Sequence, residues 1–516
     1  YNFPMGLAYI SAVLKKAGYK VDCLNLNHYQ GGVEELISRV LNKKKYDFIC
    51  TGSNALGYPI IKIIIDSTRK YSKSGVVLGG PILTTEPELI YQDLKPDFGV
   101  LGEGEETIVE LFDYLEKKKD LKKVKGIVFK DQNEGKLVIT EKREPVKDLD
   151  SLPYPDFKGM EFEKQLGKSH CNDNFFSNIF DYPRTYTILA SRSCPFHCTF
   201  CYHDSNYRQR SIDNLMKELE EAIKKYKINL ILMYDECFSV NKPRLIEFCK
   251  RIQKLRKEIS WDLKIAAQLT VHNMDREILT LMKDTGIDTI SYGFESFSPE
   301  VLKSMRKPIT PELIDKTFHE TLKAKIGIQA NFIFGDIAET KETAKKTLDW
   351  WKKKCKGQVG LGFIQPYPGS KIYEHCIKRG IIKDKLEFIK NQISADHWFN
   401  MTDNMTDKEI QELRREILDS TSKYSKFVNP LSMKKMKKNI YQFIVKCPYC
   451  GQITIYKNCF VKNRFTYGFN LICRGCHMRF FVVSTIQKLA YQHYPKVRAL
   501  RDYEKRIIKY FSKKKL

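Results

Sequence analysis

The sequence lacks any run of about 18 uncharged apolar residues, and its mean hydropathy is −0.42. A membrane-spanning helix is therefore excluded. Fifteen cysteines in 516 residues are too few for a disulfide scaffold. Because no secretion signal is visible, we expect a cytoplasmic protein whose clustered thiols bind metals. The chain begins with Tyr1 rather than Met, so we expect a trimmed start and leave a removed signal peptide open.

Acidic residues are scarce near the end of the chain. Residues 431–516 contain 20 Lys and Arg against Asp502 and Glu504, a net charge of +18 out of +26 for the whole chain. This excess favours an anionic partner, such as a membrane surface, a phosphorylated carrier or a nucleic acid. The segment 505–515 has the composition of a basic amphipathic helix. A solvated, frayed end is the alternative.

The first 125 residues alternate short apolar runs with amphipathic patterns, which indicates a parallel sheet covered by helices. We expect helices at 6–16, 60–71, 87–94 and 106–117, and strands at 20–26, 47–52, 76–79 and 98–101. Ligands bind such sheets at the carboxyl ends of the strands. Those ends read Gly52-Ser53-Asn54, Gly79-Gly80 and Gly102-Glu103. Glycines there let a planar ligand approach the backbone, although ordinary turn chemistry also uses them.

The order of these parts resembles the cobalamin-binding module that precedes radical SAM domains. The matching pieces are 4–14, 52–56, 79–81 and 102–105. The resemblance implies a Rossmann-like domain at 1–125, lacking the module's first strand, with the strand-end residues around cobalamin. Many cobalamin proteins ligate cobalt through the His of an Asp-x-His-x-x-Gly loop, but here that place reads Asn2-Phe3-Pro4-Met5-Gly6. We therefore expect cobalamin without a protein His ligand, with a cofactor-free relic as the alternative.

Residues 126–181 read as a hairpin followed by a linker. Two apolar runs at 124–129 and 136–140 flank a polar turn, which is typical of a hairpin. Pro153 and Pro155 then fix an extended connector. The segment 149–157, which contains both prolines, is similar to the joint between the two domains in the same family.

Three cysteines follow an apolar strand predicted at 185–190. Cys194, Cys198 and Cys201 have the spacing C-x3-C-x2-C on one loop. Three thiolates can ligate three irons of a [4Fe–4S] cluster and leave the fourth iron open for S-adenosylmethionine (SAM). Nothing in ordinary core packing requires three cysteines at these offsets.

Residues 182–385 resemble the radical SAM superfamily, which implies a partial (β/α)6 barrel of the TIM type. Strands are expected at 230–234, 261–268, 289–292, 329–334 and 361–365. Polar residues at the carboxyl ends of barrel strands read as functional. The resemblance implies that SAM is held by Phe200, Tyr202, Asp235, Glu236, Gln268, Glu295, Ser296 and Gly335. The alternative for the pair after the second strand is a helix cap, and Glu339 reads as structural.

A second cysteine cluster lies near the end of the chain. After a helical extension at 386–430, two C-x2-C pairs fall within 431–485 and resemble a zinc ribbon: Cys447, Cys450, Cys473 and Cys476. Four thiolates make a closed, structural tetrahedral site. Zinc is the expected metal, with a rubredoxin-like iron or a second iron–sulfur cluster as alternatives. Residues 486–516 form the basic tail.

The resemblance implies a radical SAM enzyme. A flavodoxin or ferredoxin reduces the cluster, SAM is cleaved to a 5′-deoxyadenosyl radical, and methylcobalamin then methylates an unactivated carbon. A cobalamin-free enzyme catalysing oxidation, cyclisation or rearrangement is the alternative. A non-enzymatic nucleic-acid-binding ribbon protein would leave the first three cysteines unexplained. The substrate, anionic if the basic tail contacts it, does not follow from the sequence.

Overall fold

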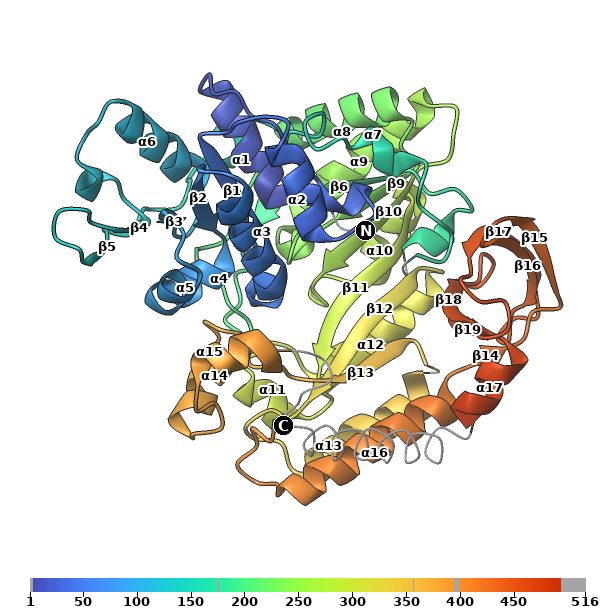
Figure 1. Ribbon diagram of the computed structural model, residues 1–516. Helices are drawn as coiled ribbons and strands as arrows, with labels where there is room; N and C mark the ends of the chain where they lie inside the picture. The colour runs from blue at the N-terminus through green and yellow to red at the C-terminus, as the bar shows by residue number, and fades with distance from the viewer. Residues whose placement is uncertain (1–2, 174–175, 356, 394–398, 493–516) are drawn as a thin grey trace. The chain divides into compact units, whose positions relative to one another are not determined.

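The computed structural model describes residues 3–173, 176–355, 357–393 and 399–492 (Figure 1). The chain divides into two compact units, which we describe separately. The first unit comprises 1–166, 190–219 and 364–401, and the second comprises 167–189, 220–363 and 402–516. None of the described helices is long and apolar enough to cross a membrane.

The first unit contains a five-stranded sheet in the order β1-β2-β3-β4-β5. The strands are β1 (Phe48–Gly52), β2 (Gly75–Gly79), β3 (Phe98–Val100), β4 (Ile127–Lys130) and β5 (Leu137–Ile139). The first three are parallel, whereas the predicted hairpin β4–β5 adds two antiparallel strands to the same sheet. The hairpin therefore extends the sheet of the first domain.

Helices cover both faces of this sheet. The helices of this stretch are α1 (Met5–Lys16), α2 (Val33–Leu41), α3 (Tyr58–Tyr71), α4 (Pro81–Thr85), α5 (Pro87–Leu94) and α6 (Glu105–Glu116). Leu14 of α1 and Ile108 of α6 share a buried cluster with Val100 of β3. The residue before Val100 in β3, Gly99, faces Leu83 of α4. Because successive residues of a strand point to opposite faces, α4 lies on the other side of the sheet.

The strand predicted at 20–26 is wrong. The structure has no strand there and only a short 3-10 helix at Leu26–His28. Tyr19 and Val21 pack against the cluster of α1 and α6. The segment alternates apolar and polar residues because two of its side chains reach the core, and it does not pair with another strand.

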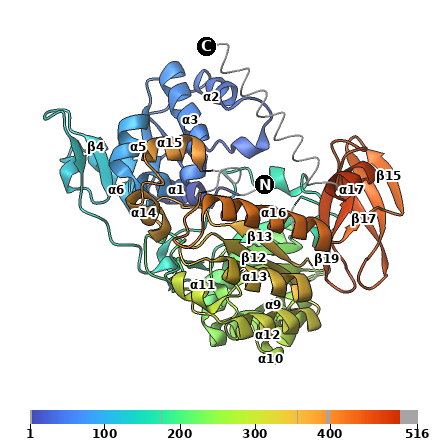
Figure 2. The same ribbon diagram turned by 90° about the horizontal axis from the view of Figure 1, so that it is seen from below.

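The second unit contains six parallel strands in the order β13-β12-β11-β10-β9-β6. They are β6 (Thr185–Ile188), β9 (Leu230–Met233), β10 (Lys264–Leu269), β11 (Ile287–Glu295), β12 (Gly327–Phe334) and β13 (Val359–Phe363). Figure 2 shows α9 (Lys242–Glu258), α10 (Arg276–Thr285) and α12 (Pro311–Lys323) side by side along this sheet. The predicted strands and the α/β class are confirmed.

The remaining α-helices lie before, between and after these strands in the chain. They are α7 (Glu163–Leu166), α8 (Ile212–Tyr226), α11 (Pro299–Ser304), α13 (Lys341–Trp350), α14 (Lys371–Lys378), α15 (Lys385–Glu387), α16 (Asp407–Tyr424) and α17 (Thr485–Gln492). The helix α16 begins with a capping box in which the hydroxyl of Thr406 accepts from the Glu409 N–H. The helix α16 lies within the helical extension predicted at 386–430.

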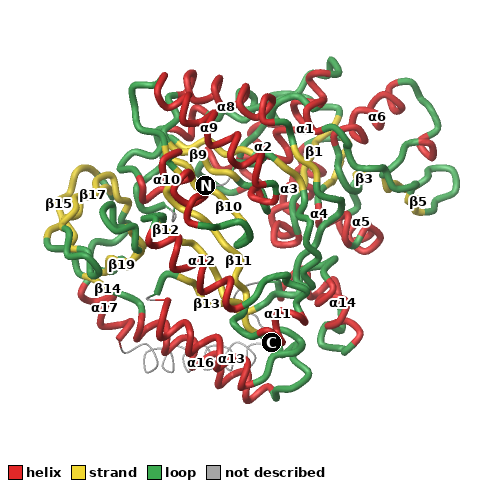
Figure 3. Tube along the Cα trace, turned by 180° about the vertical axis from the view of Figure 1, so that it is seen from behind, coloured by secondary structure: helices red, strands yellow, loops and turns green. Residues whose placement is uncertain are grey.

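The last described part of the second unit is a pair of small sheets, visible in yellow in Figure 3. One has the order β15-β16-β17 and the other β14-β19-β18. The strands are β14 (Phe427–Val428), β15 (Ser432–Lys437), β16 (Ile440–Lys446), β17 (Ile453–Phe460), β18 (Gly468–Ile472) and β19 (Arg479–Val483). Two of these strands, β17 and β18, lie between the two cysteine pairs. The tail segment predicted as a basic helix falls in 493–516, outside the described residues.

Candidate functional site

The first three cysteines lie on a loop of the first unit that a short strand pair closes at its base. The strands β7 (Ser191–Arg192) and β8 (Arg208–Gln209) pair antiparallel and bring the two ends of the segment 193–207 together. Within it, the Cys201 N–H donates to the Cys198 carbonyl at 3.1 Å. Ser193 has a φ of +63°, and its hydroxyl donates to the Ser205 carbonyl at 2.6 Å. The sequence therefore folds this cysteine loop into a compact turn that carries all three thiols.

Two arginines at the base of the cysteine loop bind two acids that follow β3. Arg208 lies 2.5 Å from a Glu103 oxygen, and Arg192 lies 2.6 Å from Glu105 and 3.4 Å from Glu103. These four side chains are at most 17% exposed. Burial alone would raise the pKa of Glu103, but the Arg208 hydrogen bond and the Arg192 charge hold it below its ordinary value. We call these four residues the arginine clamp.

A buried ion pair continues from the clamp into the following helix. Arg210 lies 2.7 Å from Glu218 of α8, with side chains 5% and 3% exposed. Its guanidinium also donates to the Asn214 side chain at 2.5 Å. Tyr9 of α1 stacks under the Arg192 guanidinium at 5.2 Å. Sequence reasoning missed Tyr9, Glu105 and Arg192, because their pairing joins positions far apart in the chain.

The rest of the cysteine loop packs within the first unit. The Ile372 N–H donates to the Thr199 carbonyl at 3.0 Å. A Cβ on Gly369 would lie 2.5 Å from the Tyr202 ring, so a glycine is needed for the loop to sit there. Tyr202 donates to Asp204 at 3.2 Å, while Phe200 is half-buried. The structure thus places both predicted aromatics on the loop itself; their contact with SAM stays a prediction.

The remaining residues predicted to hold SAM lie in the second unit, where four neighbouring strands end. Asp235 is buried and Glu236 exposed after β9, and Gln268 is exposed on β10. Glu295 ends β11, and Gly335 follows β12. Because parallel neighbours end at one edge of the sheet, the structure brings these residues to the same edge.

Glu295 is held in an unusual backbone conformation. Its φ is +61°, a region that non-glycine residues seldom occupy. Lys307 donates to its carboxylate at 3.2 Å, and the two side chains are 17% and 11% exposed. A Cβ on Gly293 would lie 2.3 Å from the Glu295 oxygen and 2.8 Å from Lys307 Nζ. Gly293 and Lys307, both missed by sequence reasoning, therefore set the direction of the Glu295 carboxylate.

The other two strand-end positions are tied into the fold. The Ser296 hydroxyl lies 3.3 Å from that of Thr347 and accepts from the Ser298 N–H at 3.2 Å. The Gly335 N–H donates to Glu339 at 3.1 Å, and Gly335 has a φ of +94°. Burial raises the pKa of Glu339 to about 8, so this carboxyl is protonated at neutral pH.

The strand ends of the first sheet are lined by half-buried glycines. Gly52 and Gly79 are paired across β1 and β2, and both are half-buried. The following Gly80 has a φ of +87°, and its Cβ would lie 2.9 Å from the Ser53 carbonyl. Asn54 caps the next turn by accepting from the Leu56 N–H, and Leu56 is 48% exposed. Backbone without side chains beside an exposed apolar residue suits a large, flat ligand.

Two residues predicted to contact cobalamin take part in holding the cysteine loop. The Gly102 N–H donates to the Thr84 hydroxyl, and a Cβ there would lie 2.9 Å from Asp204. Glu103 belongs to the arginine clamp and also accepts from the Val146 N–H at 3.0 Å. Their contact with cobalamin stays a prediction.

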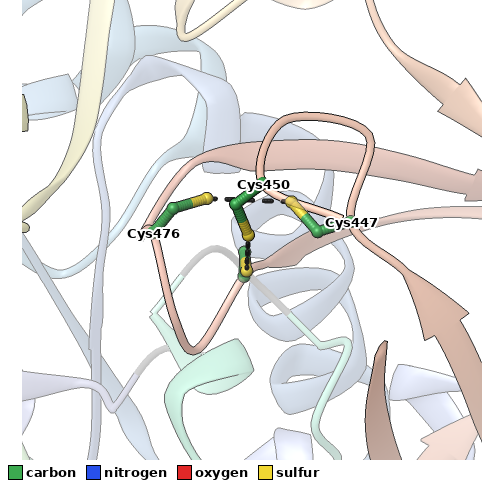
Figure 4. A group of neighbouring side chains, drawn as sticks. Cys447, Cys450 and Cys476 are labelled. Carbon is green, nitrogen blue, oxygen red and sulfur yellow. Dashed lines mark hydrogen bonds between the residues drawn. The ribbon is translucent and has the colours of Figure 1, made fainter. Parts of the chain in front are cut away.

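Four cysteines meet in the second unit (Figure 4), and all four sulfur atoms lie within 4.8 Å of one another. Cys447 and Cys476 have their sulfurs 3.7 Å apart, and Cys450 and Cys473 have theirs 3.6 Å apart. A tetrahedron with metal–sulfur bonds of about 2.3 Å has sulfur–sulfur edges of about 3.8 Å. The donor set therefore has the size of a four-coordinate thiolate site.

Two known families match the segments that contain the cysteine loop and the glycine-rich strand ends. The radical SAM superfamily model matches residues 188–350, which include the cysteine loop and the ends of β9 to β12. The B12-binding domain model matches residues 1–112, which include the glycine-rich ends of β1 to β3. This chain is a radical SAM enzyme with a B12-binding domain. The two matched segments therefore contain the cysteine loop and the strand ends at which we expect the ligands to bind.

The relatives of this radical SAM enzyme include proteins named as a methyltransferase and as a cyclase. An uncharacterized methyltransferase of Pyrococcus horikoshii is 27% identical over 73% of this chain and 79% of its own. The anaerobic magnesium-protoporphyrin IX monomethyl ester cyclase of Rubrivivax gelatinosus is 25% identical over 72% of this chain and 66% of its own. The structure is similar to TsrM, a radical SAM methyltransferase of Kitasatospora setae with cobalamin and a [4Fe–4S] cluster bound. That match has a TM-score of 0.59 and 16% identity, covers 72% of each chain, and shows the fold.

Proposed function

We propose that this radical SAM enzyme is cobalamin-dependent and methylates an unactivated carbon of its substrate. The observation that carries the proposal is the arginine clamp. Its acids, Glu103 and Glu105, follow a strand of the B12-binding domain, and its arginines flank the cysteine loop. The clamp therefore couples the cobalamin-binding sheet to the loop that would hold the cluster.

The residues present suit the groups that the family implies. Three thiols on one loop match a cluster with one open iron. The paired glycines at the ends of β1 and β2, with the exposed Leu56, offer a flat and partly apolar surface to a corrin ring. When bound, the cluster and SAM supply radical generation by reductive cleavage, and cobalamin supplies a transferable methyl group.

The chain's own residues bind and orient these groups. Cys194, Cys198 and Cys201 would ligate three irons. Lys307 aims the Glu295 carboxylate, and the protonated Glu339 holds the Gly335 N–H in place. We also propose that a flavodoxin or ferredoxin delivers the electron. We propose the following division of the chain: a cobalamin-binding domain at 1–125, a hairpin and linker at 126–181, a radical SAM domain at 182–385, a helical extension at 386–430, the ribbon at 431–485 and a basic tail at 486–516.

The direct test is anaerobic purification followed by assays of the cofactors and products. We expect absorption near ~400 nm, about four irons beyond the ribbon metal, and SAM cleavage, all lost in Cys198→Ala. Cys237→Ala serves as the control, because Cys237 is a buried thiol outside the loop. A Cys198→Ala protein that keeps the cluster and cleaves SAM would disprove the assignment.

Cyclisation or oxidation without methyl transfer is the second candidate, since one relative is named a cyclase. Turnover with SAM bearing a deuterated methyl group separates the two. A product that gains the labelled methyl supports methylation, whereas a product that only loses hydrogen supports the second candidate.

We further propose that the four C-terminal cysteines hold structural zinc. Contacts within the second unit place this ribbon at the amino ends of the large sheet. His477 lies 3.4 Å from Asp288 of β11, and Gln358, just before β13, donates to the Arg479 carbonyl at 3.0 Å. Eight residues of β12 then separate the ribbon from Gly335, or about 25 Å. A metal at that distance stabilises the fold and does not touch the substrate. Elemental analysis distinguishes zinc from iron, and a red, visibly absorbing ribbon would contradict zinc.

A further inference from the structure

The ribbon has an exposed sheet face that no part of the described chain covers. In the β15-β16-β17 sheet, Phe443 and Tyr456 sit opposite each other and are 0% and 1% exposed, so they mark the inner face. Their neighbours in the strands point the other way. This outer face contains Lys434, Ile444, Lys446, Ile453 and Ile455, with Ile453 58% and Ile455 46% exposed.

Exposed apolar side chains are concentrated in the ribbon. Of the 16 large hydrophobic residues exposed in the described chain, eight fall between Leu431 and Leu489. Six of them belong to the ribbon: Leu431, Met436, Ile453, Ile455, Phe460 and Phe465. Clustered exposed apolar residues mark an interaction site, whereas scattered ones need no explanation.

The charge of the ribbon is of one sign. Residues 431–485 contain ten Lys and Arg and no Asp or Glu. Seven of these are lysines, all exposed: Lys434, Lys435, Lys437, Lys438, Lys446, Lys457 and Lys462. Lysines on the edge strand β15 would by themselves be explained as protection against edge-to-edge pairing. That explanation does not account for the isoleucines on the outer face.

We propose that the outer face of the ribbon docks on the surface of an anionic lipid bilayer. Lysines attract acidic headgroups, while aliphatic side chains enter the boundary between headgroups and acyl chains. A second copy of the chain carries the same positive charge on this face and would be repelled. The tail at 493–516, with nine Lys and Arg against two acids, would also be repelled. Nucleic acid is disfavoured, since single strands bind stacking aromatics and arginines, and this face presents isoleucine and lysine.

The test is sedimentation of the full-length protein with vesicles of phosphatidylcholine, with and without phosphatidylglycerol. Wild type should bind only the anionic vesicles, and binding should weaken as salt rises. Ile453→Ser/Ile455→Ser should lower binding by about tenfold at constant zinc content, because two partly inserted side chains are lost. Lys434→Gln/Lys446→Gln should lower binding and flatten its salt dependence.

The matched control is Ile60→Ser/Ile63→Ser, which removes two isoleucines of α3 with exposures of 44% and 38%. It should bind vesicles like wild type, as should Lys353→Gln/Lys354→Gln, two exposed lysines outside the ribbon. If Ile453→Ser/Ile455→Ser binds as the control does, or if RNA shifts the protein in a gel while vesicles do not bind it, the proposal is wrong. If only Lys513→Gln/Lys514→Gln/Lys515→Gln abolishes vesicle binding, the tail and not the ribbon is the anchor.

Discussion

At the scale of single residues, the strand-end carboxylate Glu295 depends on partners that the sequence does not reveal. Its side chain turns back over Gly293 and meets Lys307, twelve positions further along the chain. Removing one partner of a buried ion pair is costly because the other charge stays desolvated. Lys307 is therefore a positioning residue for an acid that we predict to lie near SAM.

We predict that Lys307→Met raises the KM for SAM by about tenfold, with iron content and kcat at saturating SAM little changed, and that Lys307→Arg restores most of the loss. The control is Lys346→Met, because Lys346 pairs with Glu300 at 3.3 Å where both side chains are more than half exposed. The SAM-cleavage rate of each purified variant is measured against SAM concentration. Equal effects of the two methionine substitutions would remove the special role of Lys307.

The buried carboxyl of Glu339 predicts a dependence of stability on pH. Burial raises its pKa from 4.5 to about 8 in the folded chain. Between these values the unfolded chain releases a proton that the folded chain keeps, so rising pH lowers the free energy of unfolding, by up to ~1.4 kcal/mol per pH unit. The stabilising contribution is thus complete below pH 4.5 and lost by about pH 8.

Glu339→Gln removes this titration and keeps the hydrogen bond from Gly335. We predict that its Tm exceeds that of wild type near pH 8 and that the difference shrinks toward pH 4.5. Glu342→Gln, at an exposed acid in the first turn of α13, is the control and should show no such trend. A constant Tm difference at all pH values would mean that Glu339 is ionised in the folded state.

At the scale of elements, the cysteine loop is a strand-closed loop whose base is held by charge. Glu103 accepts from Arg208 and faces Arg192, all largely buried. We predict that Glu103→Gln makes a chelator remove the cluster about tenfold faster and alters its electron paramagnetic resonance spectrum, since two buried guanidinium groups lose a negative partner. Glu110→Gln, which interrupts the Arg143 pair on α6, is the control and should leave both readouts unchanged.

Elements were predictable where the local pattern and the tertiary environment agree. The six parallel strands of the second unit are apolar runs bounded by turns, and all appear in the structure. The strand β15, Ser-Met-Lys-Lys-Met-Lys, was missed because its edge position leaves nearly every side chain exposed and hides the period of two. Glu103 was predicted to contact cobalamin, but its pairing with Arg208 and Arg192 could not be predicted, because only the tertiary structure brings these arginines beside it. The three cysteines needed no tertiary information, since their spacing on one loop is itself the signature.

At the scale of the whole molecule, the two parts of the proposed chemistry belong to different segments of the chain. The B12-binding match ends at residue 112, and the radical SAM match begins at residue 188. Loss of cobalamin should therefore be separable from loss of SAM cleavage, provided that the substitution leaves the first sheet intact.

Gly79 is the position where this separation is cleanest. A Cβ there would meet only Val100 atoms at 3.7 and 3.8 Å, an ordinary contact, whereas at Gly52 it would lie 2.6 Å from the Gly79 carbonyl. Gly80 has a positive φ, so substitution there strains the backbone whatever the space. We predict that Gly79→Ala retains hydroxocobalamin nearly as wild type does. Gly79→Leu should lose it, because the longer side chain crowds the end of β2, beside which the corrin would lie.

The readouts are the cobalamin absorbance after desalting, the iron content, and SAM cleavage. Gly32→Leu, where an added side chain meets open space before α2, is the control for a bulky residue in the same domain. In Gly79→Leu we expect SAM cleavage to persist while methyl transfer to the substrate stops, because radical generation needs only the cluster and SAM. If wild type retains no cobalamin and still cleaves SAM, the first domain is a cofactor-free relic and the enzyme performs cobalamin-independent chemistry.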